Sequence, residues 1–271
     1  MVVADLHVHT TNSDGRLTLD AVPAAARAAG LEAVAVTDHD RLHPGLDAPV
    51  TDREGVRLVH GIELRVDAGD QRLDLLGYGA RRTGALDAET DRIQRDRVAR
   101  GRAIVDCVEE RLGHPLPVDV ERGFGRPDVA RAVVESDDGY DDIGAVFDDL
   151  IGEDCPCYVP RDVPSFERGR EVLAGACAVV GLAHPLRYPD PEAALARAEH
   201  LDAVEVYYPY DGERGHGTLS ESPLDVAAVE AAAERHDLLV TGGSDAHGET
   251  LGTTGLPRTA YERVERALVG R

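Results

Sequence analysis

The sequence predicts an α/β fold with a parallel sheet, and three observations support this. Short apolar runs alternate along the 271 residues with helical stretches rich in Ala, Arg and Glu. The hydrophobic fraction of 42% suits a globular chain, and this length allows one large domain or one domain with an insertion. Histidines and carboxylates recur directly after the apolar runs, as expected where the strands of a parallel barrel end on one face.

Seven apolar runs are the candidate strands: 2–6, 33–36, 56–59, 73–76, 178–182, 203–206 and 238–240. The first helix is expected over 19–29, where a Leu/Ala face has Pro23 near its start and Gly30 at its end. The other helices are expected between the later runs.

A long stretch between the fourth and fifth runs, 81–176, carries no strong strand pattern. It contains three expected helices: 86–112, 126–134 and 143–151. We therefore predict a barrel formed by 1–80 and 177–271, with 81–176 as a helical insertion covering the mouth of the barrel.

The charge balance excludes one class of function. The chain has 51 acidic and 29 basic residues, a net charge of −22, and every basic residue is arginine. An acidic surface repels phosphate backbones, so a protein that binds long DNA or RNA is not expected. Because the acidity is spread along the chain, we interpret it as adaptation to a salty cytosol, where the repulsion is screened.

Two further features bear on location and redox state. No apolar run approaches the ~20 residues of a membrane span, and the N-terminus lacks a signal-peptide pattern, so a soluble cytoplasmic protein without membrane contact is expected. The four cysteines are Cys107, Cys155, Cys157 and Cys177, and none forms a C-x-x-C pair. We expect buried or incidental thiols rather than disulfides or a zinc site.

The strongest signal is the set of polar residues at the strand ends. It comprises His7, His9, Asp14, Asp38, His39, Asp40, Glu63, Asp74, His184, Asp245 and His247. Each residue taken alone is better explained as a surface or core side chain. Together they predict a site for two or three divalent first-row metal ions, because imidazole and carboxylate ligands converge there. The other six histidines, expected to lie outside this site, are His43, His60, His114, His200, His216 and His236.

These motifs resemble a known family. The strings H-x-H-T-x-x-S-D-G, T-D-H-D, G-I-E, L-A-H-P and G-S-D-A-H-G are similar to those of the polymerase-and-histidinol-phosphatase (PHP) family of metal-dependent phosphoesterases. The insertion, with Gly125-Arg126-Pro127, Phe147 and 158–161, resembles the stand-alone subgroup that includes nucleoside 3′,5′-bisphosphate phosphatase and a 5′-3′ exoribonuclease. The resemblance covers essentially the whole chain.

The resemblance implies a distorted seven-stranded (β/α) barrel and a trinuclear metal site. The implied ligands are His7, His9, Glu63 and Asp245 for a first ion; Glu63, Asp74 and His184 for a second; and Asp14, His39 and His247 for a third. Manganese, zinc or iron usually occupy such sites.

Two positions depart from the family pattern. Asp74 stands where the family usually has histidine, which favours Mn²⁺ over Zn²⁺ or weakens the second site. Asp128 stands where the subgroup usually has histidine, which leaves the substrate preference open.

The expected chemistry is phosphoester hydrolysis by metal-activated water at the centre around Glu63 and Asp245. Arg126 and Arg187 are candidate clamps for the phosphate, with surface ion pairs as the alternative. Asp40 is a candidate leaving-group acid or, equally, a cap of the following turn.

The predicted function is hydrolysis of a phosphomonoester of a small nucleotide, such as a nucleoside 3′,5′-bisphosphate. The alternatives are a 5′-3′ exonuclease on short RNA, a histidinol-phosphate-type phosphatase, and, least favoured, a non-catalytic metal-binding module. The expected partner is a small phosphorylated substrate or a short oligonucleotide, and the sequence carries no signal for an oligomeric state.

Overall fold

The computed structural model describes residues 1–210 and 224–269, so His216 lies outside the described residues. The chain divides into two compact units: unit 1 is Met1–Asp87 with Pro164–Arg271, and unit 2 is Ala88–Val163. Among the described helices, none is long and apolar enough to cross a membrane.

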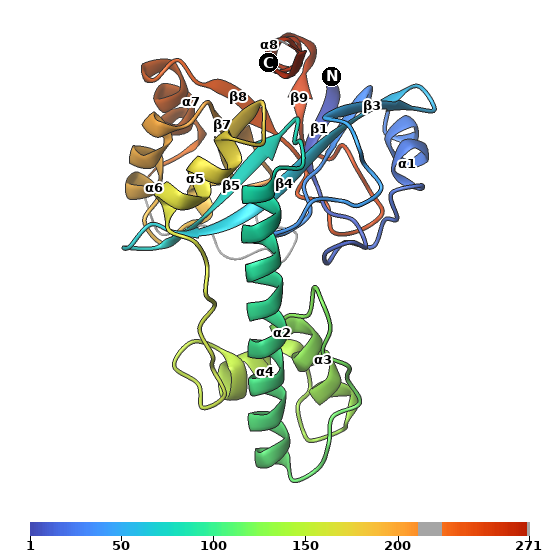
Figure 1. The fold of residues 1–271 in the computed structure, drawn as a ribbon, viewed down its shortest axis with the longest axis vertical. Helices are drawn as coiled ribbons and strands as arrows, with labels where there is room; N and C mark the ends of the chain where they lie inside the picture. The colour runs from blue at the N-terminus through green and yellow to red at the C-terminus, as the bar shows by residue number, and fades with distance from the viewer. Residues whose placement is uncertain (211–223, 270–271) are drawn as a thin grey trace. The chain divides into compact units, whose positions relative to one another are not determined.

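Unit 1 is built on one mixed sheet (Figure 1). Its strands are β1 Val2–Val8, β2 Ala33–Val36, β3 Val50–Arg53, β4 Val56–Asp67, β5 Arg72–Tyr78, β6 Val179–Leu182, β7 Ala203–Tyr207, β8 Leu239–Gly242 and β9 Leu256–Pro257. The order is β8-β7-β6-β5-β4-β2-β1-β9, with β3 paired to β4. Backbone hydrogen bonds from His9 N to Ala246 O (3.0 Å) and from Ala246 N to His7 O (3.3 Å) join the chain beyond β8 to β1. The sheet therefore curves into a nearly closed barrel.

The predicted α/β barrel is confirmed, and all seven expected strands are present. The expectation of a wholly parallel sheet is wrong for β5, which runs antiparallel to both β4 and β6. The physical reason is the short connection between β4 and β5, which permits a hairpin but no crossover. The short strands β3 and β9 are additional, and both are antiparallel to their partners.

In the part of unit 1 that the structure describes, seven helical elements accompany the sheet besides the start of α2 (Gly84–Leu112). They are α1 Val22–Ala28, α5 Phe166–Ala174, α6 Pro191–Arg197, α7 Val226–Arg235, α8 Arg258–Val269 and the short 3-10 turns Pro185–Arg187 and Ala198–His200. Helix α5 packs on β4, β5 and β6.

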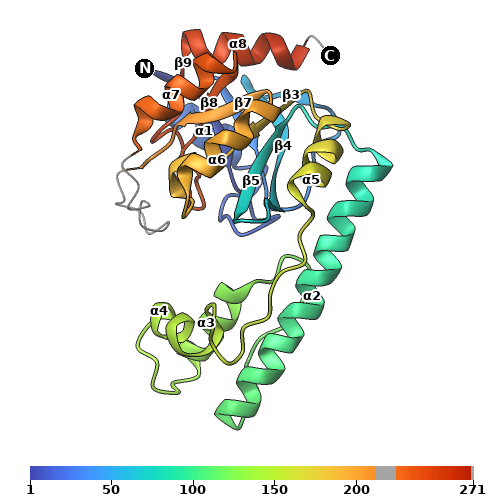
Figure 2. The same ribbon diagram turned by 90° about the vertical axis from the view of Figure 1, so that its left-hand side faces the viewer.

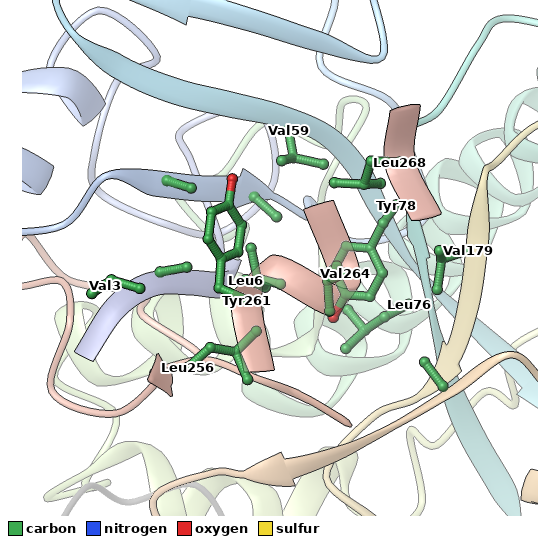
Figure 3. Packing of buried hydrophobic residues seen from close by; sticks show 14 of the residues in the cluster. Val3, Leu6, Val59, Leu76, Tyr78, Val179, Leu256, Tyr261, Val264 and Leu268 are labelled. Carbon is green, nitrogen blue, oxygen red and sulfur yellow. The ribbon is translucent and has the colours of Figure 1, made fainter. Parts of the chain in front are cut away.

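Helix α8 closes the end of the barrel at which β1 begins. Its Tyr261, Val264 and Leu268 are buried among strand side chains that include Leu6 and Tyr78 (Figure 3). This leaves the opposite end, where β1 finishes, for the polar residues that follow the strands.

Unit 2 is helical and has its own core. It contains most of α2 Gly84–Leu112, then α3 Arg126–Glu135, α4 Ile143–Val146 and a π-helical turn Phe147–Ile151. These match the three helices expected in the insertion, and Figure 2 shows α3 beside α4. The expectation of free thiols is wrong for two cysteines, because Cys107 and Cys157 form a disulfide that ties α2 to the segment after the π-helical turn. Their separation of 50 residues gives no pairing signal in the sequence.

Candidate metal centre

The strand ends bring the predicted ligands together through sharp turns of the backbone. His7 lies in β1 and His9 directly follows it, while His184 and Asp245 follow β6 and β8. His184 (φ 25°) and Asp245 (φ 51°) adopt left-handed conformations that are strained for non-glycine residues. Gly243 permits the close approach of the two strands, because a Cβ there would lie 2.3 Å from the backbone nitrogen of His7.

Glu63 is at the centre of the predicted ligand set. Its Oε1 lies 3.0 Å from His184 Nε2 and 3.5 Å from His7 Nε2. Its Oε2 lies 3.4 Å from His9 Nε2 and 2.7 Å from His39 Nδ1. One buried carboxylate thus faces four imidazoles.

The nine predicted ligands fall into four overlapping groups whose ligand atoms lie within 4.8 Å of one another. The groups are His7, His9 and Glu63; His7, His184 and Asp245; Glu63, Asp74 and His184; and His9, Asp14, His39 and His247. The overlaps at His7, His9, His184 and Glu63 make this one continuous cluster of potential metal ligands.

The donor set suits divalent metal ions. Among the described residues, buried His7 Nε2 and both ring nitrogens of His9 have no hydrogen-bond partner, and the same holds for His184 Nδ1. Buried imidazole nitrogens are usually satisfied by a hydrogen bond or a metal. Mixed imidazole and carboxylate ligands of this kind suit first-row divalent ions.

The charges of the site also favour cations. Burial raises the pKa of the Glu63 carboxyl, but His39 and His7 outweigh this and hold that pKa well below its ordinary value. Burial lowers the pKa of His39, yet Glu63 and then Asp14 raise it to about 9. Without metal, the carboxylates therefore favour a protonated imidazole at His39, and a metal ion would supply the positive charge instead of the proton.

Comparison with known families identifies the chain. The model of the PHP domain family matches residues 5–146, more than half of the chain. The chain belongs to the PHP domain family. The resemblance seen in the sequence motifs is thereby confirmed.

Curated relatives and solved structures agree with this assignment. The 3′,5′-nucleoside bisphosphate phosphatase of Chromobacterium violaceum is 31% identical over 265 residues, covering 91% of this chain and 88% of that protein. The 5′-3′ exoribonuclease Rnm of Escherichia coli is 26% identical over 261 residues, covering 91% and 85%. A candidate metal-dependent phosphoesterase from Bifidobacterium adolescentis superposes with a TM-score of 0.75 at 25% identity, covering 100% of this chain and 99% of that one. The protein is a metal-dependent phosphoesterase, a hydrolase acting on phosphoester bonds.

Glu205 on β7 contacts two of the predicted ligands, and it was not among the residues predicted from the sequence. Its two oxygens lie 3.1 and 3.2 Å from His7 Nδ1, and Oε2 also accepts the backbone N–H of His184 at 2.8 Å. A carboxylate can only accept, so His7 Nδ1 carries the proton and Nε2 is left for a metal. The signal was a single charged residue within the apolar run 203–206.

Two more buried carboxylates shape the loops around the centre. Asp38 accepts from the backbone N–H of Thr10 at 2.7 Å and from the hydroxyl of Ser13 at 2.8 Å, which folds the loop leading to Asp14. Asp5 accepts from Gly252 N and Ser244 N, both at 2.9 Å, and fixes the chain after β8 against β1.

Arg187 and Tyr208 lie against the predicted ligand Asp245. Tyr208 donates its hydroxyl to Asp245 Oδ2 at 2.9 Å, while Arg187 Nη1 lies 2.6 Å from the Tyr208 hydroxyl and 3.3 Å from Asp245 Oδ2. The side chain of Arg187 is 24% exposed. The predicted arginine is thus next to the PHP centre and reachable by solvent.

Asp40 is buried beside the centre in a left-handed conformation (φ 53°). Its Oδ1 accepts the backbone N–H of Arg65 at 3.0 Å, and its own N–H donates to Glu63 O at 2.7 Å. These bonds hold the turn after β2 against β4.

Arg126 and Asp128 lie in unit 2. The Arg126 guanidinium stacks 5.2 Å from the Phe147 ring centroid and 5.6 Å from that of Tyr158, and it donates to Ile151 O at 3.1 Å. Asp128 accepts the backbone N–H of Gly125 at 2.8 Å and so caps the start of α3.

Five of the six remaining histidines lie in the described part of the chain, and none joins a ligand group there. His60 is buried, and burial followed by the charges of His43 and Arg82 lowers its pKa to about 4. His114 pairs with Asp138 on the surface of unit 2 at 2.8 Å. Their expected place outside the metal site therefore agrees with the geometry.

Proposed function

We propose that the protein hydrolyses a phosphomonoester of a small nucleotide, of the type of a nucleoside 3′,5′-bisphosphate. One observation carries the proposal: the ligand groups are complete in a chain similar over 91% of its length to a bisphosphate phosphatase.

We assign two or three divalent ions to the PHP centre. The first ion would use His7, His9, Glu63 and Asp245, the second Glu63, Asp74 and His184, and the third Asp14, His39 and His247; the ligand groups support these sets. These sets contain four carboxylates, and Glu63 belongs to two of the sets. Such a share of oxygen ligands favours Mn²⁺, with Zn²⁺ or Fe²⁺ as alternatives. When bound, the ions would supply hydroxide from water near neutral pH and neutralise the phosphate oxygens.

Arg187 is our candidate for binding the phosphate that is cleaved. Nη1 is the one nitrogen of the Arg187 side chain that forms hydrogen bonds to described residues. Nε and Nη2 are therefore available to donate to two phosphate oxygens. Tyr208 keeps the guanidinium beside Asp245, with the arginine carbon 5.7 Å from the ring centroid. Asp40 as the leaving-group acid stays a prediction.

Arg126 stays a candidate phosphate-binding residue within unit 2. It belongs to a group of arginines in unit 2, because burial and then the charges of Arg126 and Arg161 lower the pKa of Arg100 to about 10. Positive charge concentrated in a chain of net charge −22 marks an anion-binding region.

A second candidate function is 5′-3′ exonuclease activity on short RNA. The supporting observation is the similarity of the chain to the Escherichia coli exoribonuclease over 91% of its length. The net charge of −22 argues against long polyanions and leaves oligonucleotides of a few residues as substrates. Both functions use the same chemistry at the same centre.

The deciding experiment offers adenosine 3′,5′-bisphosphate and a five-nucleotide RNA side by side, with Mn²⁺ in molar KCl. Release of one phosphate from the bisphosphate, with the RNA intact, supports the phosphatase. A shortening ladder from the RNA moves the assignment to the exonuclease. Glu63→Gln should abolish either activity, whereas His114→Gln, on the surface of unit 2, is the matched control and should keep it.

We also propose that the enzyme works in a cytosol of high salt. The support is the excess of 51 acidic over 29 basic residues, spread over the chain. Mutual repulsion of these charges would be screened at molar salt, where the Debye length is ~3 Å.

A further inference from the structure

We propose that Arg65 competes with the divalent ion for Asp74, which makes the position between Glu63, Asp74 and His184 the weakest metal site of the PHP centre. The inference uses the metal assignment of the proposed function and is independent of the substrate. It assigns to Arg65 the role of setting metal occupancy.

The strand register places the arginine on the aspartate. Arg65 on β4 is directly opposite Asp74 on β5, and Glu63 is opposite Leu76, two residues away on each strand. Side chains two residues apart on a strand point to the same face, so Glu63, Arg65 and Asp74 share one face of the hairpin. The arginine therefore points toward the same region as two proposed ligands of the second ion.

Arg65 holds one oxygen of the Asp74 carboxylate. Its Nε donates to Oδ1, while Oδ2 lies 3.8 Å from His184 Nε2. His184 Nε2 is closer to Glu63 Oε1, at 3.0 Å. Only one oxygen of Asp74 thus faces the metal ligands, and the other is already paired with a cation.

Asp74 differs in this respect from Asp245, the other ligand carboxylate paired with arginine. Asp245 Oδ2 is held by both Tyr208 (2.9 Å) and Arg187 (3.3 Å), and its Oδ1 lies 3.1 Å from His9 Nε2. Asp245 would stay oriented without its arginine. Among the described residues, the Asp74 carboxylate has only Arg65 and the distant His184 as partners.

The Arg65–Asp74 ion pair has opposite effects on the metal-free and the metal-bound protein. The Asp74 side chain is 2% exposed, so in the metal-free protein Arg65 supplies the positive charge that a buried carboxylate needs. When an ion binds at Oδ2, the guanidinium places a full positive charge on the far side of the same carboxylate. At an effective dielectric constant near 20, charges a few ångströms apart repel strongly enough to lower the metal affinity about tenfold.

The test measures metal binding without substrate. Metal is first removed with a chelator. The metal-free protein is then titrated with Mn²⁺ in molar KCl, and electron paramagnetic resonance distinguishes the bound from the free ion. We expect one weak binding step in the parent protein, and Arg65→Gln should tighten that step about tenfold while leaving the tighter steps unchanged. Arg65→Lys keeps the charge and should leave the step weak. Asp74→Asn should remove it.

Thermal unfolding supplies a second readout. Metal-free Arg65→Gln should unfold at a lower temperature than the parent, yet gain more on addition of Mn²⁺. Arg187→Gln is the matched control, and it should leave the weakest binding step unchanged because Tyr208 still holds Asp245.

Two results would overturn the proposal. Weaker Mn²⁺ binding in Arg65→Gln would show that the arginine only orients Asp74. A weak step that persists in Asp74→Asn would place the weakest ion elsewhere. Failure of the protein to hydrolyse nucleotides would refute the proposed substrate and leave these binding measurements intact.

Discussion

Glu205→Gln is the substitution whose effect on the metal centre can be derived most directly. In the parent protein, Oε2 of Glu205 accepts the His184 N–H, and the carboxylate also accepts the proton of His7 Nδ1. In the variant, the amide oxygen must stay on the His184 N–H, because an amide nitrogen cannot accept there. The amide N–H then faces His7 Nδ1, which has to become the acceptor. The proton of His7 consequently moves to Nε2, the nitrogen that faces Glu63 and Asp245.

The size of the effect follows from the loss of His7 as a ligand, because an Nε2 that carries a proton cannot bind a metal ion. Outer partners of metal-bound histidines typically contribute about 10- to 100-fold to metal affinity, which is roughly 1.4 to 2.8 kcal/mol. We expect Glu205→Gln to weaken Mn²⁺ binding by this factor, and the phosphoesterase activity should be recovered in part at higher Mn²⁺. The assay is calorimetric titration of the metal-free protein, with kcat/KM measured at increasing Mn²⁺.

Asp5→Asn is the control for Glu205→Gln, because Asp5 is equally buried and touches no histidine ring. It should lower the stability of unit 1 without changing the intrinsic metal affinity. Parent-like Mn²⁺ affinity in Glu205→Gln would refute the argument about the tautomer. Equal losses of affinity in the two variants would show a general effect of disturbing β1.

Three further predictions concern stability. Reducing the Cys107–Cys157 disulfide, which closes a loop of 50 residues, should lower the free energy of unfolding of unit 2 by about 4 kcal/mol, measured by denaturant titration with and without reductant. The pKa of buried His60 is lowered from 6.5 to about 4, so its contribution to stability is complete above pH 6.5 and is lost as the pH falls to 4. That loss is about 3 kcal/mol, and His60→Gln should remove this part of the pH dependence of unfolding. Activity and melting temperature should both rise toward molar KCl; full activity and stability in dilute buffer would contradict the interpretation of the −22 charge.

The convergence of the predicted ligands could be predicted because residues that follow the strands of a barrel lie on one face, wherever they occur in the sequence. His7, His184 and Asp245 are far apart in the sequence, yet each follows or ends a strand and so reaches the same face. A pattern of polar residues after apolar runs is therefore sufficient to predict that they meet. It does not predict which atoms meet, such as the sharing of Glu63 Oε2 between His9 and His39.

The partners of the ligands could not be predicted in the same way. Tyr208 and Arg187 meet Asp245 through the conformation of the segments after β6 and β7, for which the sequence has no periodic signal. The Cys107–Cys157 disulfide depends on the packing of α2 against a segment 50 residues away. Such contacts arise from tertiary packing, and a local pattern contains no information about them.

The antiparallel direction of β5 explains the position of Asp74, and it was not predicted because the expected strand 56–59 stops well before the end of β4 at Asp67. Only residues 68–71 separate β4 from β5, and Gly69 in this turn has φ +91°, whereas a parallel connection needs a dozen or more residues. In a hairpin, a ligand need not follow the strand, because the register brings a residue within β5 beside the end of its neighbour. Asp74 reaches the centre from inside its strand for this reason, and the same register necessarily places it opposite Arg65. The position of Asp74 and its pairing with the arginine that we propose competes for it are thus two results of one short turn.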